Sequence, residues 1–166
     1  MVCMTQPAWR IAPLTAEYVH GLAECHIACW REAYRGLVPD YILDAFEVER
    51  RAEQWERVRV RNPGCAYVAL VDDEVIGFSC ATAARDESPV TPTELNALYV
   101  RAAWYGTGVA HDLIRAAVPP DIPCSLWVFE KNPRAQAFYR KHGFELDGTS
   151  RIEAFTPAVE VRMVRF

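Results

Sequence analysis

The chain has 166 residues, of which 51% are hydrophobic and 24% charged, and its formal net charge is −4. This length suits one domain over residues 1–166, the acidic balance argues against nucleic acid as a partner, and no apolar run reaches the about 20 residues of a membrane-spanning helix. The N-terminus also lacks the basic start and apolar stretch of a secretory signal. We therefore expect a cytoplasmic protein with no membrane partner.

Apolar residues recur in patterns that predict alternating strands and helices. Thr15 and Asn132 are placed to cap helices, and Asp44 and Glu47 have the spacing of a capping box. In chain order we predict a strand at 9–14, a helix from residue 15, a loop at 34–39, a helix from residue 44 to about 60, a hairpin of strands at 65–71 and 75–83, a strand at 94–100, a helix at 109–118, a strand at 125–129, a helix from residue 133 to 142, and a terminal strand pair that ends with residues 159–166. This order predicts an α/β layout with a mixed sheet.

The cysteines and histidines give little sign of metal or nucleophilic chemistry. Cys25 and Cys29 are one helical turn apart, but no second pair exists to complete a tetrahedral zinc site. We therefore expect buried thiols here and at Cys124, and no metal. No histidine stands in a pattern for nucleophilic catalysis. The six cysteines are Cys3, Cys25, Cys29, Cys65, Cys80 and Cys124.

A glycine-containing turn between a predicted strand and helix has the features of a phosphate-binding site. Gly106 and Gly108 would let the backbone approach a pyrophosphate with no Cβ in the way. The following helix offers free backbone N–H groups and the positive end of its dipole. Many strand-to-helix turns need glycine for geometry alone, so this stretch by itself fits both interpretations equally.

The segment 125–144 resembles the GNAT acetyltransferase superfamily. It contains a strand followed by Asn-x-x-Ala-x-x-Phe-Tyr, a basic residue and Gly-Phe, all in register with the family signature. The N-terminal pattern Trp-Arg-x-x-Tyr-x-Gly-x-x-Pro at 30–39 is also common in that family. The resemblance therefore extends over nearly the whole chain.

The glycine turn is similar to the pyrophosphate loop of the same family, with departures. Ala103 or Tyr105 stands where that loop has an amide or basic side chain, and Ala102 stands where proline is frequent. These departures leave the backbone cradle intact and remove the usual side-chain contact with phosphate. Arg101 is one candidate to replace it.

The resemblance implies a fold and an activity. The fold would be a central, mixed, mostly antiparallel sheet of about seven strands, with about four helices packed on both faces. The activity would be transfer of an acetyl group from acetyl-CoA to a primary amine, either a small amine or a peptide or protein amine, by direct attack in a ternary complex. A module that binds acyl-CoA as a sensor without turnover is an alternative of a different class. A homodimer is left open.

The resemblance also implies roles for single residues. An amine attacks a thioester only when neutral, and Glu94 matches the acidic residue that helps to deprotonate it; the alternative is a solvent-facing strand residue. Tyr139 matches the general acid that protonates the leaving thiolate; the alternative is a core aromatic. Glu32, Asp40 and Glu153 are possible substitutes for Glu94 or ligands of the substrate. The implied cofactor-binding residues are Leu98, Val100, Tyr105, Gly106, Thr107, Gly108, Val109, Ala110 and Asn132, and the implied substrate-binding residues are Trp30 and Tyr34.

Two further expectations concern the shape and charge of the site. The strand at 94–100 typically bulges and splays from its neighbour, which leaves its backbone groups free to pair with the pantetheine arm. Trp30 and Tyr34 are expected to form an aromatic wall, and Glu32 and Asp40 are near them in the sequence. This composition would suit a cationic, partly apolar amine.

Overall fold

The computed structural model describes residues 8–153 and 155–166, and its centre is a seven-stranded sheet in the order β1-β2-β3-β4-β5-β7-β6. The pair β4–β5 is parallel, and the other neighbouring strands are antiparallel. The predicted mixed, mostly antiparallel sheet is therefore confirmed. Its strands are β1 (Arg10–Pro13), β2 (Ala66–Val71), β3 (Glu74–Ala83), β4 (Thr93–Val100), β5 (Cys124–Phe129), β6 (Glu145–Ile152) and β7 (Val159–Arg165).

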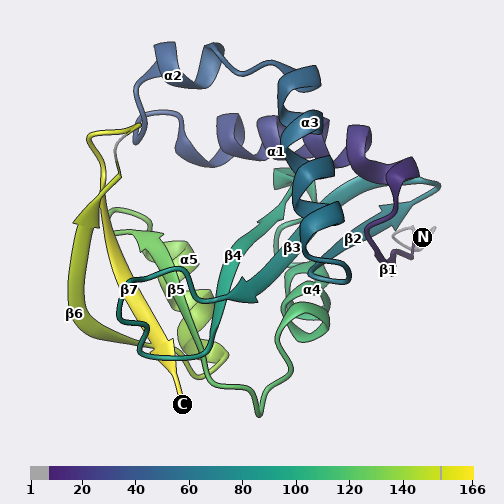
Figure 1. Cartoon of the computed structure of the whole chain (residues 1–166). Coiled ribbons are helices and arrows are strands. Elements are labelled where there is room, and N and C mark those ends of the chain that lie inside the picture. The colour runs from purple at the N-terminus through teal and green to yellow at the C-terminus, as the bar shows by residue number, and fades with distance from the viewer. Residues whose placement is uncertain (1–7, 154) are drawn as a thin grey trace, which may run out of the picture.

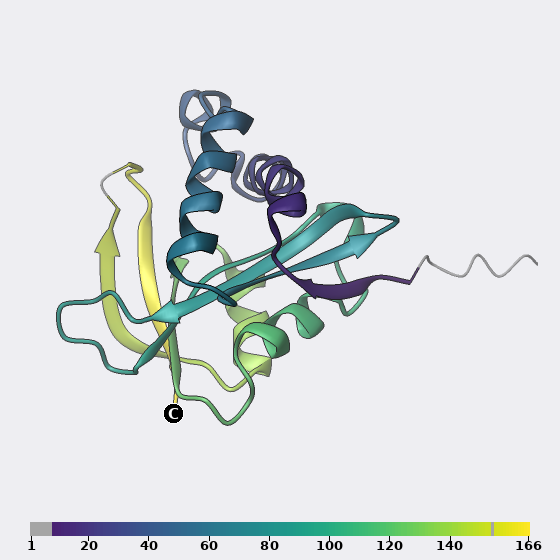
Figure 2. The same cartoon turned by 45° about the vertical axis from the view of Figure 1, so that its right-hand side comes forward.

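Helices cover both faces of the sheet, so that the molecule has three layers (Figures 1 and 2). One face carries α1, α2 and α3, and the other carries α4 and α5. This arrangement follows from the sequence, because each helix has one apolar stripe that must be buried against the sheet. The helices are α1 (Val19–Tyr34), α2 (Asp40–Asp44), α3 (Val48–Arg61), α4 (Val109–Ala117) and α5 (Pro133–Lys141), with short 3₁₀ turns at Ala16–Tyr18 and Ala102–Trp104.

The core lies on both faces of the sheet. Under α1 and α3, buried Leu22 and Trp55 pack with Phe78 of β3. Under α4 and α5, buried Ile114 and Phe144 pack with strands β4, β5 and β7. Full burial of one such side chain contributes about 1.5–3 kcal/mol, so these two clusters fix the sheet between its helical layers.

The predicted capping box at Asp44 is wrong. Asp44 is the last residue of the short helix α2, and its carboxylate lies 3.1 Å from the guanidinium of Arg35. Glu47 is the residue before α3, and its side chain forms no cap hydrogen bond. The pattern misled because a separate short helix, α2, follows Pro39 and ends at Asp44, before α3 begins.

The predicted cap at Asn132 is confirmed, whereas Thr15 only precedes a 3₁₀ turn without a side-chain cap. The Asn132 side chain accepts a hydrogen bond from the Ala135 N–H (3.2 Å), and Pro133 is the first helical residue. The predicted hairpin is also present, and its turn places Asp72 at φ 47° and Asp73 at φ 66°. Positive φ at two successive residues is the geometry that a two-residue hairpin turn requires.

Candidate active site

A cleft opens through the sheet where β4 and β5 separate. These strands pair only from Thr93 and Cys124 to Leu95 and Leu126, although both continue further. The pairing of β4 with β3 is also irregular, because its register skips Asn96, which forms a β-bulge. The separation leaves backbone groups on the facing strand edges without strand partners, and an extended ligand can pair with such groups.

A cavity of about 240 Å³ fills this gap and gathers many of the predicted site residues. Side chains from both helical layers line it, so the cavity joins the two faces of the sheet. The remaining predicted cofactor residues, 106–110, lie on the loop and helix start next to Tyr105. The predicted residues that line the cavity are Trp30, Tyr34, Glu94, Leu98, Val100, Tyr105, Asn132 and Tyr139.

The glycine turn has the backbone of an open cradle. Gly106 has φ 75° and Gly108 has φ 100°, a region in which side chains other than glycine are strained. No heavy atom lies within 4 Å of a Cβ built on Gly106, and at Gly108 only the Trp9 ring does, at 3.8 Å. Helix α4 follows directly. The N–H groups of its first turn have no acceptor within the helix, so they can bind a ligand. The turn therefore fits a pyrophosphate group.

An arginine from α5 lies where the pyrophosphate loop lacks a basic side chain. The guanidinium of Arg134 is 3.6 Å from the ring centroid of Tyr105. Arg101, the substitute suggested by the sequence, instead pairs with Glu32 of α1 at 2.9 Å. Arg134 is therefore the cation beside the loop, because helix α5 brings it there.

Three tyrosines with raised pKa values surround the cleft. Burial raises the pKa of Tyr139 and that of Tyr34, and it raises the pKa of Tyr99 to about 12. The Tyr34 hydroxyl donates to the Tyr99 oxygen at 3.2 Å. All three phenols therefore stay protonated at neutral pH and can donate a proton or a hydrogen bond.

Two groups of carboxylates face the cleft. Glu94 is buried, and both of its oxygens accept hydrogen bonds from Arg85, from the guanidinium at 3.0 Å and from the backbone N–H at 3.2 Å. Glu160 of β7 accepts from Arg151 at 2.8 Å, and Arg151 also pairs with Glu153. Burial raises the pKa of Glu160 and outweighs the lowering effect of Arg151.

The aromatic wall has the predicted residues but lacks the two predicted acids. The Trp30 ring packs edge-on to Tyr34, with centroids 4.9 Å apart. Glu32 is held by Arg101 and the Ala102 N–H, and Asp40 pairs with Arg35. Neither acid is among the residues that line the cleft.

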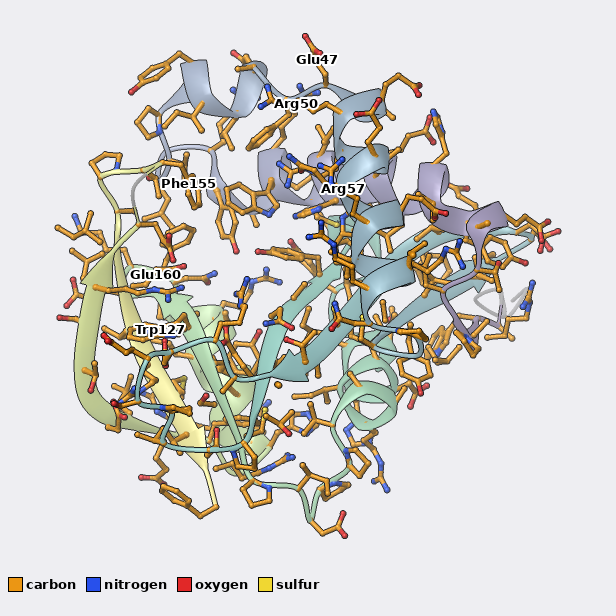
Figure 3. The ribbon with its side chains drawn as sticks, in the orientation of Figure 1. Glu47, Arg50, Arg57, Trp127, Phe155 and Glu160 are labelled. Carbon is orange, nitrogen blue, oxygen red and sulfur yellow. The ribbon has the colours of Figure 1, made fainter. Side chains whose placement is uncertain are left out.

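A larger groove of about 930 Å³, here called the α3 groove, opens beside the cleft between α3 and the sheet. Figure 3 shows Arg50 and Arg57 on α3, and Trp127, Phe155 and Glu160 on the opposite side of the site. The groove and the cleft are continuous because they share part of their lining. The shared residues are Trp30, Arg85, Asn96, Ala97, Tyr99 and Phe155.

Several residues of the site were missed by the sequence analysis. Glu160, Arg85 and Arg134 reach the cleft from β7, from the loop before β4 and from α5. No local motif marks the first two. Arg134 stands inside the Asn132–Tyr139 signature, so its place beside the loop could have been inferred from that register.

The predicted buried thiols are confirmed at Cys25, Cys29 and Cys124, whereas Cys3 lies outside the described residues. The sulfur atoms of Cys25 and Cys29 are 3.8 Å apart. Across residues 8–153 and 155–166, no group of three His, Cys, Asp or Glu side chains is arranged to hold a metal ion. Within the same ranges, no helix has the length and hydropathy to cross a membrane.

The sequence of the chain has relatives among known proteins. The chain is 26% identical over 131 residues to a probable N-acetyltransferase of Mycobacterium tuberculosis, which covers 76% of this chain and 74% of that protein. It is 34% identical over 118 residues to an uncharacterized N-acetyltransferase of the same organism, which covers 68% of this chain and 73% of that protein.

Solved structures share the fold over almost the full length. The PaiA N-acetyltransferase of Thermoplasma acidophilum, determined in complex with coenzyme A, has a TM-score of 0.72 at 19% identity, covering 95% of this chain and 98% of that one. The ribosomal-protein-alanine N-acetyltransferase of Brucella melitensis has a TM-score of 0.68 at 20% identity, covering 95% and 99%. Residues 26–144 match the acetyltransferase (GNAT) family model. The chain therefore belongs to the acetyltransferase (GNAT) family, with N-acetyl transfer from acetyl-CoA as its activity.

Proposed function

We propose that this chain acetylates a primary amine by direct attack in a ternary complex. The observation that carries the proposal is the single cavity between β4 and β5, which a phenol enters from one face of the sheet and carboxylates from the other. Direct transfer needs a proton acceptor beside the attacking amine and a proton donor beside the departing thiolate, both within reach of one thioester carbonyl.

Backbone groups and two side chains would hold acetyl-CoA, the source of the acetyl group. The Thr107 N–H already donates to the Trp104 carbonyl at 3.4 Å, whereas the N–H groups of the first turn of α4 point out of the helix end and can bind its pyrophosphate. Arg134 adds a cation beside them. The free edge of β4 near Leu98 and Val100 would bind the pantetheine arm, and a backbone N–H there would stabilise the oxyanion. Asn132, which caps α5, lines the same cavity and can contact the arm.

For the base, the geometry favours Glu160 over the expected Glu94. Glu160 is paired in register with Phe129 at the end of β5, and in a parallel pair this is the same end of the sheet as Val100. Glu94 lies near the opposite end of β4, about 13 Å from Leu98 at roughly 3.3 Å per strand residue. Arg85 engages both oxygens of Glu94, whereas Arg151 engages only Oε2 of Glu160. Burial raises the pKa of Glu160, which makes its carboxylate a stronger proton acceptor than an ordinary glutamate.

For the acid, we assign Tyr139. It lines the cavity from α5, and its raised pKa keeps the phenol protonated until the thiolate leaves. No hydrogen bond within the described residues engages its hydroxyl, so the proton is available to the leaving group.

The test is Tyr139→Phe, with Tyr67→Phe on β2 as the matched control. We expect Tyr139→Phe to lower kcat roughly 10²- to 10⁴-fold, with acetyl-CoA still raising the melting temperature as in the wild type. The control should keep full activity because Tyr67 lies outside the cleft. Unchanged turnover in Tyr139→Phe would refute its role. A protein that binds acetyl-CoA but releases no CoA with any amine would favour the sensor alternative.

A further inference from the structure

The α3 groove is cationic, although the chain as a whole has a net charge of −4. Three arginines line it, Arg50, Arg51 and Arg85, against the single carboxylate of Glu47. Arg85 is neutralised by Glu94. Among residues 8–153 and 155–166, no carboxylate lies within 4.0 Å of the side-chain nitrogens of Arg50 or Arg51.

Arg51 is held in the groove rather than extended into solvent. Its guanidinium is 5.0 Å from the centroid of the Phe46 ring, and this ring packs edge-on to Trp30 at 5.6 Å. Its charge contributes, after burial, to the lowered pKa of His26 on the groove wall. A partly buried cation without an anionic partner is costly, so this placement points to an anionic ligand.

Asn96 offers a second donor where the groove meets the cleft. Its side-chain oxygen lies 2.9 Å from the Thr82 hydroxyl. Its amide nitrogen is buried and has no partner among the described residues. Asn96 lines both cavities, so this donor lies on the path between Arg51 and the cleft.

We propose that the α3 groove binds a carboxylate of the acceptor, so that the substrate is an amine that also carries a carboxylate. Arg51 and Arg50 bind the carboxylate, and Trp30 and Phe46 contact the apolar part of the molecule. The Asn96 amide donates a hydrogen bond to the acceptor where the groove meets the cleft. This inference rests on the proposed function. It replaces the expectation of a cationic amine, which depended on Glu32 and Asp40.

The test compares acids with their neutral amides. A series of ω-amino acids, from 4-aminobutyrate to 8-aminooctanoate, is assayed for CoA release beside the corresponding ω-amino amides. We expect the acids to be acetylated faster than the amides. The chain length with the highest rate should correspond to the distance from the cleft to Arg51. The dipeptide amides Ala-Asp and Ala-Asn form a second pair, which tells whether a free carboxylate or an acidic peptide side chain is the better source. Equal rates for acid and amide in both pairs would overturn the inference.

The variant is Arg51→Gln, with Arg115→Gln on the exposed face of α4 as a control of equal charge change. Loss of a hydrogen bond to a charged group predicts a roughly ten- to hundredfold fall in kcat/KM for the acids, mainly through KM, with the amides unaffected. The control should retain the preference. An Arg51→Gln variant with the wild-type preference would also overturn the inference.

A binding measurement separates this inference from the proposed function. With CoA present, 6-acetamidohexanoate should raise the melting temperature of the wild type more than 6-acetamidohexanamide does, and Arg51→Gln should abolish the difference. This result needs no turnover, so it supports the groove even if every amine fails as a substrate. Equal shifts for acid and amide in the wild type count against the groove, and a working acetyl transfer to neutral amines would then leave the proposed function intact.

Discussion

The buried imidazole of His26 should make the stability of the protein decrease at acidic pH. The side chain is buried under α1, and its Nδ1 accepts a hydrogen bond from the Trp55 indole N–H at 2.9 Å. Burial, together with the charge of Arg51, lowers the pKa of His26 to about 3. The imidazole therefore stays neutral in the folded protein across the range in which an unfolded histidine becomes charged.

The size of the effect follows from linkage. The unfolded histidine binds a proton below about pH 6.5, while the folded one does not until about pH 3, so stability is greatest above pH 6.5 and falls as the pH decreases between these values. Between pH 7 and pH 5, this one group should reduce the free energy of unfolding by about 2 kcal/mol. With a urea m-value of about 2 kcal/mol/M, the midpoint should fall by about 1 M.

The assay is urea unfolding at pH 7 and pH 5 for the wild type and for His26→Gln, which keeps a hydrogen-bond acceptor for Trp55 but does not titrate. Subtracting the two pH dependences cancels any uniform loss of stability in the variant. His20→Gln, at an exposed position on the same helix, is the matched control and should retain most of the wild-type dependence. If wild type and His26→Gln lose stability equally between the two pH values, His26 is not a buried neutral group and the reasoning fails.

Three further predictions concern the cofactor loop, the base and the strand pairing. Ala110→Glu should greatly weaken acetyl-CoA binding, because it places a negative charge where the pyrophosphate would bind. The same charge interacts favourably with the dipole of α4, so the helix itself should be retained. Ala110→Gln is the neutral control, and equal affinity for acetyl-CoA in both variants would exclude the loop as the site. Glu160→Gln should remove the acidic limb of the kcat/KM pH profile, which in the wild type falls as pH drops through the raised pKa of Glu160; a limb that persists there and disappears in Glu94→Gln would transfer the role. Gly77→Ala should destabilise the fold by about 1–3 kcal/mol, because its Cβ would meet the Tyr99 carbonyl oxygen at 2.8 Å; a melting temperature equal to that of the wild type would show that β3 and β4 can separate at no cost.

Much of the fold could be predicted from the sequence because its signals are local. The cap at Asn132, the glycines at 106 and 108 and the hairpin turn each satisfy a backbone requirement within a few residues. The helix α2 was missed because five residues carry too little periodicity to be distinguished from a loop.

The site was harder to predict because its charges are positioned by long-range contacts. Glu160 faces the cleft only because β7 pairs with β5, more than thirty residues away in the chain. Asp40 and Glu32 are near the aromatic wall in sequence, but each is drawn away by an arginine partner. Their proximity to Trp30 in the sequence therefore suggested an acidic site, whereas arginines line the α3 groove.

The gap between β4 and β5 passes through the sheet, and in the proposed ternary complex it would give the two substrates separate entrances. The donor would approach from the side of α4 and α5, and the acceptor from the side of α1 and α3. A molecule that covalently joined CoA to an acceptor would thread the sheet and occupy both entrances at once, with the second contact strengthened by the high effective concentration that the link creates.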